Sequence, residues 1–253
     1  MKVVAVIPAR YESTRLPGKP LLKIQSKTIV QMVYERASES TMLQDVIVAT
    51  DDRRIFDHVE SFGGRVVMTA SDHQTGTDRI AEVVADVDAD VVVNVQGDEP
   101  LINKGVIESV LPPFEEDPLV QMTTLCTHLT DPDDLFNPNI VKVVCDRNGN
   151  AIYFSRSPIP YRKTPEMKRH FEVAYEELDP WFRHVGLYAY RRDFLISFSR
   201  MEQGILERLE GLEQLRALEH GARIRVIQGN YKGVGIDTHE DYMKLKTFLG
   251  EPR

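Results

Sequence analysis

Three cations and two hydroxyl groups share one short loop near the N-terminus. The loop spans residues 8–20 and follows the apolar run Val3 to Ile7. Hydroxyl groups, backbone amides and fixed positive charges together can bind the oxygens of a polyphosphate. The side chains that could do so here are those of Arg10, Ser13, Thr14, Arg15 and Lys19. The loop is therefore a candidate phosphate site.

The same loop does not follow the Walker A pattern. That motif requires a glycine where Ser13 stands, and a Ser or Thr after the lysine, where this chain has Pro20. Composition alone would favour a basic surface loop. Ligands of open α/β sheets bind beyond the ends of the strands, so the position of the loop after a first strand adds weight to phosphate binding. Both interpretations stay open on this evidence.

Two aspartates follow predicted strands and could bind a metal ion. Asp98 stands in the turn Gly97-Asp98-Glu99, directly after the apolar run Val91 to Val95, and Asp237 lies between a strand and a capped helix. Mg²⁺ is usually bound by one or two carboxylates together with the oxygens of substrate phosphates. Asp98 and Asp237 are therefore candidate magnesium ligands. Taken singly, each is equally ordinary as a carboxylate of a turn or of a helix start.

Three further polar features stand out, and the first two each allow two interpretations. The segment 74–79 opens a helix and could present backbone groups and Arg79 to a nucleotide, or it could simply cap that helix. His184 and Tyr188 stand four residues apart on a predicted strand, so they share a face and could form a substrate wall or a satisfied core pair. Gln214 lies in a leucine-rich helix, where its residue type favours a solvated position.

Composition places the chain among ordinary globular proteins. It has 253 residues, 42% hydrophobic and 28% charged, and a net charge of −8. The acidic balance argues against partners such as nucleic acid or an anionic membrane. No apolar stretch approaches the roughly 20 residues of a membrane span, and the N-terminal run is too short for a signal peptide. Cys126 and Cys145 form no disulfide framework and are expected to be buried thiols, which predicts a cytoplasmic protein.

Alternating strand and helix signals in the first half must position these residues. Strands are predicted from apolar runs at 3–7, 46–49, 65–68 and 91–95. Helices are predicted from amphipathic runs at 28–38, 55–62 and 78–87. This alternation favours an α/β fold with a single mixed, mostly parallel sheet and helices on both faces.

The second half departs from the alternation. Its predicted elements are a hairpin at 140–155, a proline-rich loop at 157–181, a strand at 184–190, one leucine-rich helix from Leu206 to Gly221 and a last helix to Leu249. Thr238 and Asp241 form a capping-box pattern at the start of the last helix. We expect one domain over residues 1–253, with an elaborated second half at about 140–235 that forms the substrate pocket and any subunit contacts.

Taken in order, the motifs of the chain resemble those of the 3-deoxy-manno-octulosonate cytidylyltransferases, or CMP-Kdo synthetases. The matching motifs are Ile7 to Arg10, Ser13 to Leu21, Ala49 to Asp51, Gly76 to Arg79, Val93 to Pro100, Phe136 to Asn139, Lys142 to Val144, Tyr153 to Arg156, Arg183 to Tyr188, Leu212 to Arg216 and Gly235 to Thr238. The ordered set covers nearly the whole chain. Asp78 stands where some members have Glu, and residues 162–181 match no family pattern.

The resemblance implies a nucleotide-diphospho-sugar transferase (Rossmann-like) fold, a homodimer, and Mg²⁺-dependent use of CTP and 3-deoxy-D-manno-octulosonate (Kdo). The implied nucleotide ligands are Ala9, Arg10, Ser13, Thr14, Arg15, Lys19, Thr75, Gly76, Thr77 and Arg79. The implied sugar-acid ligands are Gln96, Arg156, His184, Tyr188, Glu213 and Gln214. Asp98 and Asp237 would bind Mg²⁺, and Lys19, Arg15 and Asp98 would carry catalysis.

The expected reaction is attack of the anomeric hydroxyl of Kdo on the α-phosphorus of CTP, with release of pyrophosphate. The product, CMP-Kdo, serves lipopolysaccharide synthesis in this family. Two alternatives remain. One is a cytidylyltransferase for another acidic sugar, such as 8-amino-Kdo or a sialic acid, which pocket residues would distinguish. The other is a nucleotide-binding regulator without turnover, which loss of a metal carboxylate would signal; Asp98 and Asp237 are both present.

Overall fold

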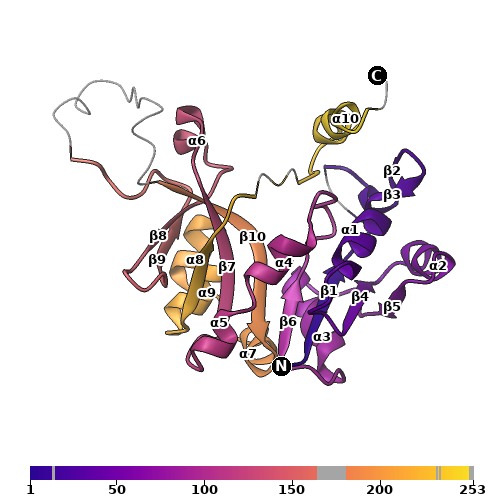
Figure 1. The fold of residues 1–253 in the computed structure, drawn as a ribbon, viewed down its shortest axis with the longest axis horizontal. Coiled ribbons are helices and arrows are strands. Elements are labelled where there is room, and N and C mark those ends of the chain that lie inside the picture. The colour runs from indigo at the N-terminus through magenta and orange to yellow at the C-terminus, as the bar shows by residue number, and fades with distance from the viewer. Residues whose placement is uncertain (13–14, 164–180, 232, 234, 251–253) are drawn as a thin grey trace. The chain divides into compact units, whose positions relative to one another are not determined.

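The chain divides into two compact units. The computed structural model describes residues 1–12, 15–163, 181–231, 233 and 235–250 (Figure 1). The first unit comprises residues 1–111, 187–200 and 232–253, and the second comprises 112–186 and 201–231. Where the sequence predicts one domain with an elaborated second half, the contacts separate a second unit that already begins at Pro112.

Four parallel strands form the sheet of the first unit. They are β1 (Val3–Pro8), β4 (Asp45–Thr50), β5 (Arg65–Met68) and β6 (Val91–Asn94), in the order β6-β1-β4-β5. The strands β1, β4 and β6 read as nearly continuous apolar runs because a parallel sheet is covered on both faces. The last residues of β10 (Phe182–Arg191) pair with β6 in the antiparallel sense.

The helices of the first unit follow the predicted alternation. They are α1 (Ile29–Ser38), α2 (Arg53–Ser61), α3 (Gly76–Ala85), α4 (Lys104–Ser109), α7 (Arg192–Phe198) and α10 (His239–Phe248). Between β1 and α1 lie the short 3₁₀ helix η1 (Lys19–Leu21) and the strands β2 (Lys23–Ile24) and β3 (Lys27–Thr28). The predicted capping box of the last helix is confirmed: Thr238 accepts from the Asp241 amide, and the Asp241 carboxylate accepts from the Thr238 amide.

The strand order places helices on both faces of this sheet. The chain crosses from β1 to β4 to β5 in one direction, through α1 and α2, and then returns through α3 to β6 on the other side of β1. Since crossovers between parallel strands are right-handed, α1 and α2 cover one face and α3 the opposite face. The crossovers diverge between β1 and β6, which is where open α/β sheets bind ligands.

The second unit has a parallel strand pair and a hairpin. Strand β7 (Met122–His128) pairs with β11 (Ile224–Gln228), and β8 (Lys142–Cys145) pairs with β9 (Ala151–Ser155) and with the first residues of β10. Its short helices are α5 (Pro113–Glu116), α6 (Pro132–Phe136), α8 (Ile205–Glu210) and α9 (Gln214–Glu219). Parallel pairing joins β6, β1, β4 and β5 in the first unit and β7 with β11 in the second, so the predicted mixed, mostly parallel sheet is confirmed.

The prediction of one leucine-rich helix was wrong. The chain forms α8 and α9 instead, because Gly211 adopts the left-handed conformation with φ of 63° and ends α8. Glycine accepts this conformation without the steric cost that a side chain brings. Leu212 and Leu215 are buried, whereas Leu209 is exposed. Within the described residues, no helix is both long and apolar enough to cross a membrane.

Gly97 allows the loop after β6 to lie directly against the end of β1. A Cβ atom on Gly97 would lie 2.8 Å from the carbonyl oxygen of Pro8, closer than such atoms approach in proteins. The sequence predicts that Gly97 serves a tight turn or a close approach to a ligand; the close approach that the structure shows is to the chain's own backbone. The two loops that carry Lys19 and Asp98 are thereby brought together.

Candidate active site

A cavity of about 1070 Å³ lies in the first unit, where the loops after β1, β4 and β6 meet. Many of the polar side chains expected at the site line it, and so do several that sequence analysis did not select. The lining residues are Pro8, Ala9, Arg10, Tyr11, Glu12, Arg15, Pro17, Lys19, Pro20, Asp51, Asp52, Arg54, Ser71, His73, Thr75, Gly76, Arg79, Gln96, Gly97, Asp98 and Asp237. Its position agrees with the rule that ligands bind at the carboxyl ends of the strands.

Lys19 joins the two aspartates predicted to bind metal. Its ammonium nitrogen lies 2.7 Å from Asp98 Oδ2 and 3.3 Å from Asp237 Oδ1. Arg15 contacts the other oxygen of Asp237 at 3.1 Å. The Lys19 side chain is 14% exposed and that of Asp98 27%, whereas Asp237 is 49% exposed, so the pair with Asp98 is better shielded from solvent than the pair with Asp237. Asp98 and Asp237, which are separated from Lys19 by 79 and 218 positions in the sequence, thus meet at its ammonium nitrogen.

The two carboxylates fit a divalent cation. Asp98 Oδ2 and Asp237 Oδ1 both point at the Lys19 ammonium, so their oxygens already converge on a single positive charge. Carboxylate oxygens are the ligands that Mg²⁺ prefers, and substrate oxygens usually complete its shell. Among the described residues, no group of three or more His, Cys, Asp or Glu side chains is arranged to hold a metal. A site of two carboxylates matches the type that relies on substrate phosphates.

The predicted phosphate ligands of the first loop lie around this cavity. Arg10 and Arg15 line it with exposed side chains, and Ala9 is buried, its amide donating to the Ala49 carbonyl at 2.9 Å. The fixed positive charges of Arg10, Arg15 and Lys19 therefore share one cavity wall. Ser13 and Thr14, also predicted to bind phosphate, lie outside the described residues.

The segment 74–79 does cap a helix. Thr75 begins α3 with a capping box, in which its hydroxyl accepts from the Asp78 amide and the Asp78 carboxylate accepts from the Thr75 amide, each at 3.1 Å. Thr75 and Gly76 line the cavity, and Thr77 is buried. The helix start therefore meets its own hydrogen-bonding needs and still faces the cavity, so the two interpretations of this segment do not exclude each other.

Arg79 is buried and holds other parts of the cavity wall. Its guanidinium lies 2.8 Å from Asp51 Oδ2, donates to the Ala70 carbonyl at 3.2 Å and contacts the Thr69 hydroxyl. These bonds tie the start of α3 to the ends of β4 and β5. Any contribution of Arg79 to a bound nucleotide is made from this fixed position.

Two of the six predicted sugar-acid ligands belong to the first unit. Gln96 lines the cavity, and its amide nitrogen donates to Asn94 Oδ1 at 3.2 Å. Tyr188 pairs with Asn94 across β10 and β6 and stacks on Tyr190 at 6.0 Å. The pairing places Tyr188 and Asn94 side by side in the sheet, close to the cavity-lining Gln96.

The other four predicted sugar-acid ligands belong to the second unit. Arg156 donates to the carbonyls of Glu210 at 2.7 Å, Pro138 at 2.8 Å and Gly211 at 3.4 Å. Glu213 precedes α9 and lies 3.8 Å from Arg216. Gln214 is buried at the first position of α9, in contrast to the solvated position that its residue type favours.

His184 is held in its neutral form. Its ring nitrogen Nε2 lies 2.9 Å from the Thr124 hydroxyl, and the ring meets Phe154 edge-on at 5.0 Å. Burial lowers the pKa of His184 to about 3. Near neutral pH the side chain therefore offers a neutral donor and acceptor pair rather than a positive charge.

Sequence analysis overlooked a buried cation beside Arg156. Lys142 is fully buried, and its ammonium donates to the carbonyls of Ile140 at 2.6 Å, Arg156 at 2.7 Å and Asn137 at 3.1 Å. Burial lowers its pKa. Lys142 thus holds the segment 137–140 against the end of β9. Its motif was part of the family resemblance, but nothing in the sequence around a strand lysine signals such burial.

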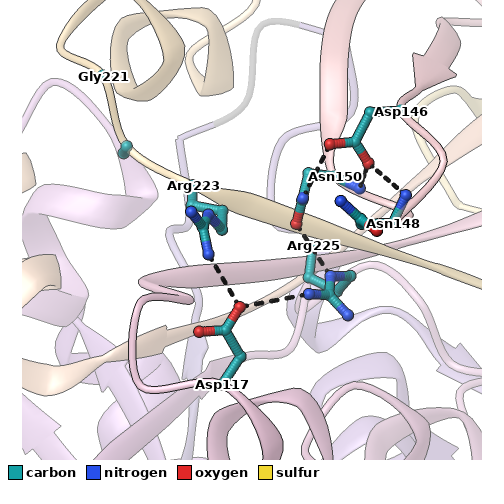
Figure 2. Close-up of a pocket in the computed structure, with 8 residues that line it drawn as sticks. Asp117, Asp146, Asn148, Asn150, Gly221, Arg223 and Arg225 are labelled. Atoms are coloured by element: carbon teal, nitrogen blue, oxygen red, sulfur yellow. Dashed lines mark hydrogen bonds and ion pairs between the residues drawn. The ribbon is translucent and has the colours of Figure 1, made fainter.

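A second cavity, of about 640 Å³, lies in the second unit (Figure 2). Arg223 and Arg225 both contact Asp117 Oδ2, at 2.9 and 3.5 Å, and Arg225 also donates to Asn150. The Leu119 amide and the Arg223 guanidinium hold the pKa of Asp117 below its ordinary value. Asp146 accepts from the amides of the hairpin turn. The charged groups of this cavity are therefore bonded to one another or to the hairpin turn.

Both cysteines have the character expected of structural thiols. Burial raises the pKa of Cys126 to about 12 and that of Cys145 to about 11. Both thiols are therefore protonated near neutral pH, and a protonated thiol is a poor nucleophile. Cys145 is half-buried rather than fully buried.

Comparison with known proteins gives consistent matches over the whole chain. The cytidylyltransferase family model matches residues 4–224. A 3-deoxy-manno-octulosonate cytidylyltransferase of Syntrophotalea carbinolica is 50% identical over 98% of this chain and 99% of the relative. One of Geobacter metallireducens is 51% identical over 97% of this chain and 96% of the relative.

Solved structures agree with these matches. A CMP:2-keto-3-deoxy-manno-octonic acid synthetase in complex with CTP superposes with a TM-score of 0.89, at 43% identity and 98% coverage of both chains. A 4-diphosphocytidyl-2C-methyl-D-erythritol synthase of Anaerococcus prevotii has a TM-score of 0.64 at 12% identity, a likeness of fold. The predicted nucleotidyltransferase fold is confirmed.

The neutral side chain of His184 predicts that the free energy of unfolding depends on pH. Its pKa is about 3 in the native state against an ordinary value of 6.5, so between these values the unfolded chain binds a proton that the native state does not. The stabilisation that comes from keeping His184 neutral in the native state is complete above about pH 6.5. As the pH drops from there toward 3, the free energy of unfolding should fall by about 1.4 kcal/mol per pH unit.

Urea denaturation between pH 7 and 4 measures this slope. His184→Asn should flatten it, whereas His239→Asn, at the exposed start of α10, should keep it. An unchanged slope in His184→Asn would show that the histidine is not held neutral.

Proposed function

Because the chain belongs to the family of 3-deoxy-manno-octulosonate cytidylyltransferases, we propose that it transfers CMP from CTP to the anomeric hydroxyl of Kdo, releasing pyrophosphate and forming CMP-Kdo. The observation that carries the proposal is the convergence of Lys19, Asp98 and Asp237 in a cavity lined by Arg10 and Arg15. Cations that could bind a triphosphate and carboxylates that could bind its metal ion thus line the same cavity, which supports the proposal. Such an arrangement suits phosphoryl-type transfer, which relies on positioning and electrostatics.

In the proposed reaction, the cations of the first loop act on the triphosphate. Lys19, Arg15 and Arg10 would neutralise charge on the leaving pyrophosphate as the bond to the α-phosphorus breaks. A triphosphate offers Lys19 anionic oxygens in place of the two carboxylates that it contacts in the structure. The sugar hydroxyl loses its proton to solvent water on attack, and we name no side chain as general base.

We propose that Asp98 and Asp237 hold Mg²⁺. When bound there, the ion supplies Lewis-acid stabilisation of phosphate charge and lowers the pKa of the attacking hydroxyl. The two carboxylates would fix its position between the loop after β6 and the start of α10. We assign Gln96, Tyr188, Arg156, His184, Glu213 and Gln214 to recognition of the sugar acid, and Ala9, Ser13, Thr14, Thr75, Gly76, Thr77 and Arg79 to the nucleotide.

We further propose a cytoplasmic homodimer that supplies CMP-Kdo for lipopolysaccharide synthesis. Large apolar side chains of the second unit are exposed, among them Ile152, Ile205 and Leu209, and a second copy of the chain would cover them. Sedimentation velocity at micromolar concentration measures the mass directly, and we expect about twice the 28.9 kDa of one chain. A single species at the mass of one chain would contradict the dimer.

A pyrophosphate-release assay with CTP and a panel of sugar acids tests the proposed activity. We expect release with CTP and Kdo in the presence of Mg²⁺, and much weaker release with a sialic acid. A site built to hydrogen-bond particular sugar hydroxyls rejects analogues that leave its polar groups unpaired. Faster turnover with 8-amino-Kdo or a sialic acid would reassign the sugar, and no turnover with any sugar acid would favour a regulator.

The metal assignment predicts large effects at two positions. Asp98→Asn and Asp237→Asn should each lower turnover by orders of magnitude. Loss of a metal ligand weakens stabilisation of the charge in the transition state, which is worth on the order of several kcal/mol. Asn keeps the shape of Asp, so melting curves should stay close to that of the wild-type protein. Rates measured at limiting and at saturating Mg²⁺ show whether higher metal concentration restores activity.

Asp193→Asn is the control for this pair, since Asp193 is exposed on α7 of the same unit, outside the residues that line the cavity. It should leave the rate unchanged at every Mg²⁺ concentration. If Asp98→Asn or Asp237→Asn kept near-normal turnover at limiting Mg²⁺, that residue would not be a metal ligand.

A further inference from the structure

Tyr11 lies between a guanidinium group and a glycine in the loop that carries Lys19. The Arg54 guanidinium carbon lies 3.3 Å from the centroid of the Tyr11 ring. On Gly18, a Cβ atom would lie 3.1 Å from the ring carbon Cζ and from the hydroxyl oxygen of Tyr11. Both Arg54 and Gly18 thus pack against this ring, and a side chain at position 18 would crowd it.

Arg54 is itself held in a fixed orientation. Its Nε and NH2 groups donate to the two carboxylate oxygens of Asp52, at 3.0 and 2.6 Å. The Arg54 amide donates to the same carboxylate at 2.9 Å, as Asp52 caps α2. The bond to Asp52 raises the pKa of Arg54, so the guanidinium stays charged. A planar group fixed at two nitrogen atoms presents its face in one orientation.

The ring is coupled through the backbone to Lys19. The Gly18 amide donates to the Tyr11 carbonyl at 2.8 Å, which closes the loop on itself. Gly18 has φ of 72°, the left-handed conformation that glycine accepts, and it directly precedes η1 and Lys19. A displacement of the Tyr11 ring would therefore shift Gly18 and, with it, the starting point of the Lys19 side chain.

We propose that Arg54 and Tyr11 form a clamp that positions the loop at residues 8–20, so that the backbone that carries Lys19 is already in place when the lysine exchanges its carboxylate partners for the triphosphate of CTP. The inference rests on the proposed function, because it takes CTP as the ligand of this cavity. Arg54 and Tyr11 are positioning residues here, since they act through Gly18 rather than on the reacting atoms. Preorganised charge is more effective in catalysis than charge that must move into place.

Neighbouring Arg53 provides a matched control on the same turn of α2. It also lies over an aromatic ring, that of Phe56 at 4.9 Å, and pairs with Asp57 at 2.8 Å. It does not belong to the residues that line the cavity. Replacing either arginine by alanine removes the same side chain, one charge and one ring contact. The two variants differ in two respects: Arg54 lines the cavity, and its ring contact leads to Gly18 and Lys19, whereas Arg53 does neither.

The experiment compares Arg54→Ala, Tyr11→Leu, their double variant, Tyr11→Phe and Arg53→Ala. The measurements are kcat and KM for CTP at saturating Kdo, KM for Kdo, affinity for CTP by isothermal titration, and melting temperature. We expect Arg54→Ala and Tyr11→Leu each to lower kcat/KM for CTP about three- to ten-fold, with KM for Kdo unchanged. Tyr11→Phe keeps the ring and should restore most of what Tyr11→Leu loses.

The double variant tests whether Arg54 and Tyr11 act as one unit. Residues that work only together lose nothing more when both are removed, so its loss should equal that of one single variant. Losses that multiply, or an Arg54→Ala enzyme that matches Arg53→Ala, would overturn the clamp. So would an equal rise of KM for Kdo, which a general loss of structure produces.

Failure of the proposed function gives a different result. If the wild-type protein released no pyrophosphate with any sugar acid, that function would fall, and titration with CTP would still compare the variants. The clamp then predicts weaker CTP binding for Arg54→Ala than for Arg53→Ala at equal melting temperature. Equal affinities, or a wild-type protein that does not bind CTP, would overturn it.

Discussion

The ammonium group of Lys19 joins parts of the first unit that are far apart in the sequence. It lies within hydrogen-bonding distance of Asp98 and Asp237, which come from the loop after β6 and the start of α10. Their approach depends on a sheet order that sets β6 beside β1, and on the absence of a side chain at Gly97. Without that close approach, the three charged groups would belong to three separate surface loops. The local geometry of the backbone thus decides where charge is concentrated.

Charge balance also shapes what this site accepts. Two partly buried carboxylates require a cation, and one shielded lysine requires an anion, because an uncompensated charge away from solvent is costly. At rest these groups satisfy each other. A ligand that brings both a triphosphate and a cation satisfies each group again with a new partner. On the proposed assignment, a ligand that brought only one of the two would leave part of this charge less well compensated, which favours the metal complex of a nucleotide over either part alone.

The features that could be predicted from the sequence are mainly those set by residues close to one another in the chain. The apolar strands and the capping boxes at Thr75 and Thr238 are set by neighbouring residues, and the structure confirms them. The pairing of Asp98 with Asp237 was expected from the family resemblance, and the rule about strand ends applies to Asp98 alone, since β11 ends at Gln228, well before Asp237. The break at Gly211 was missed because a leucine repeat outweighs one glycine in a pattern. The burial of Lys142 depends on carbonyls supplied by distant segments, which no local pattern encodes.

The division into two units has an evolutionary consequence. The described phosphate-binding candidates and both carboxylates belong to the first unit, whereas Arg156, His184, Glu213 and Gln214 belong to the second. Under the proposed assignments, selection can act on recognition of the acceptor and on recognition of the nucleotide through largely separate sets of positions. Descendants of such a chain could acquire a new sugar by drift in the second unit, while the machinery for the triphosphate is inherited intact. Lineages that diverge in acceptor should accordingly differ most in that part of the chain.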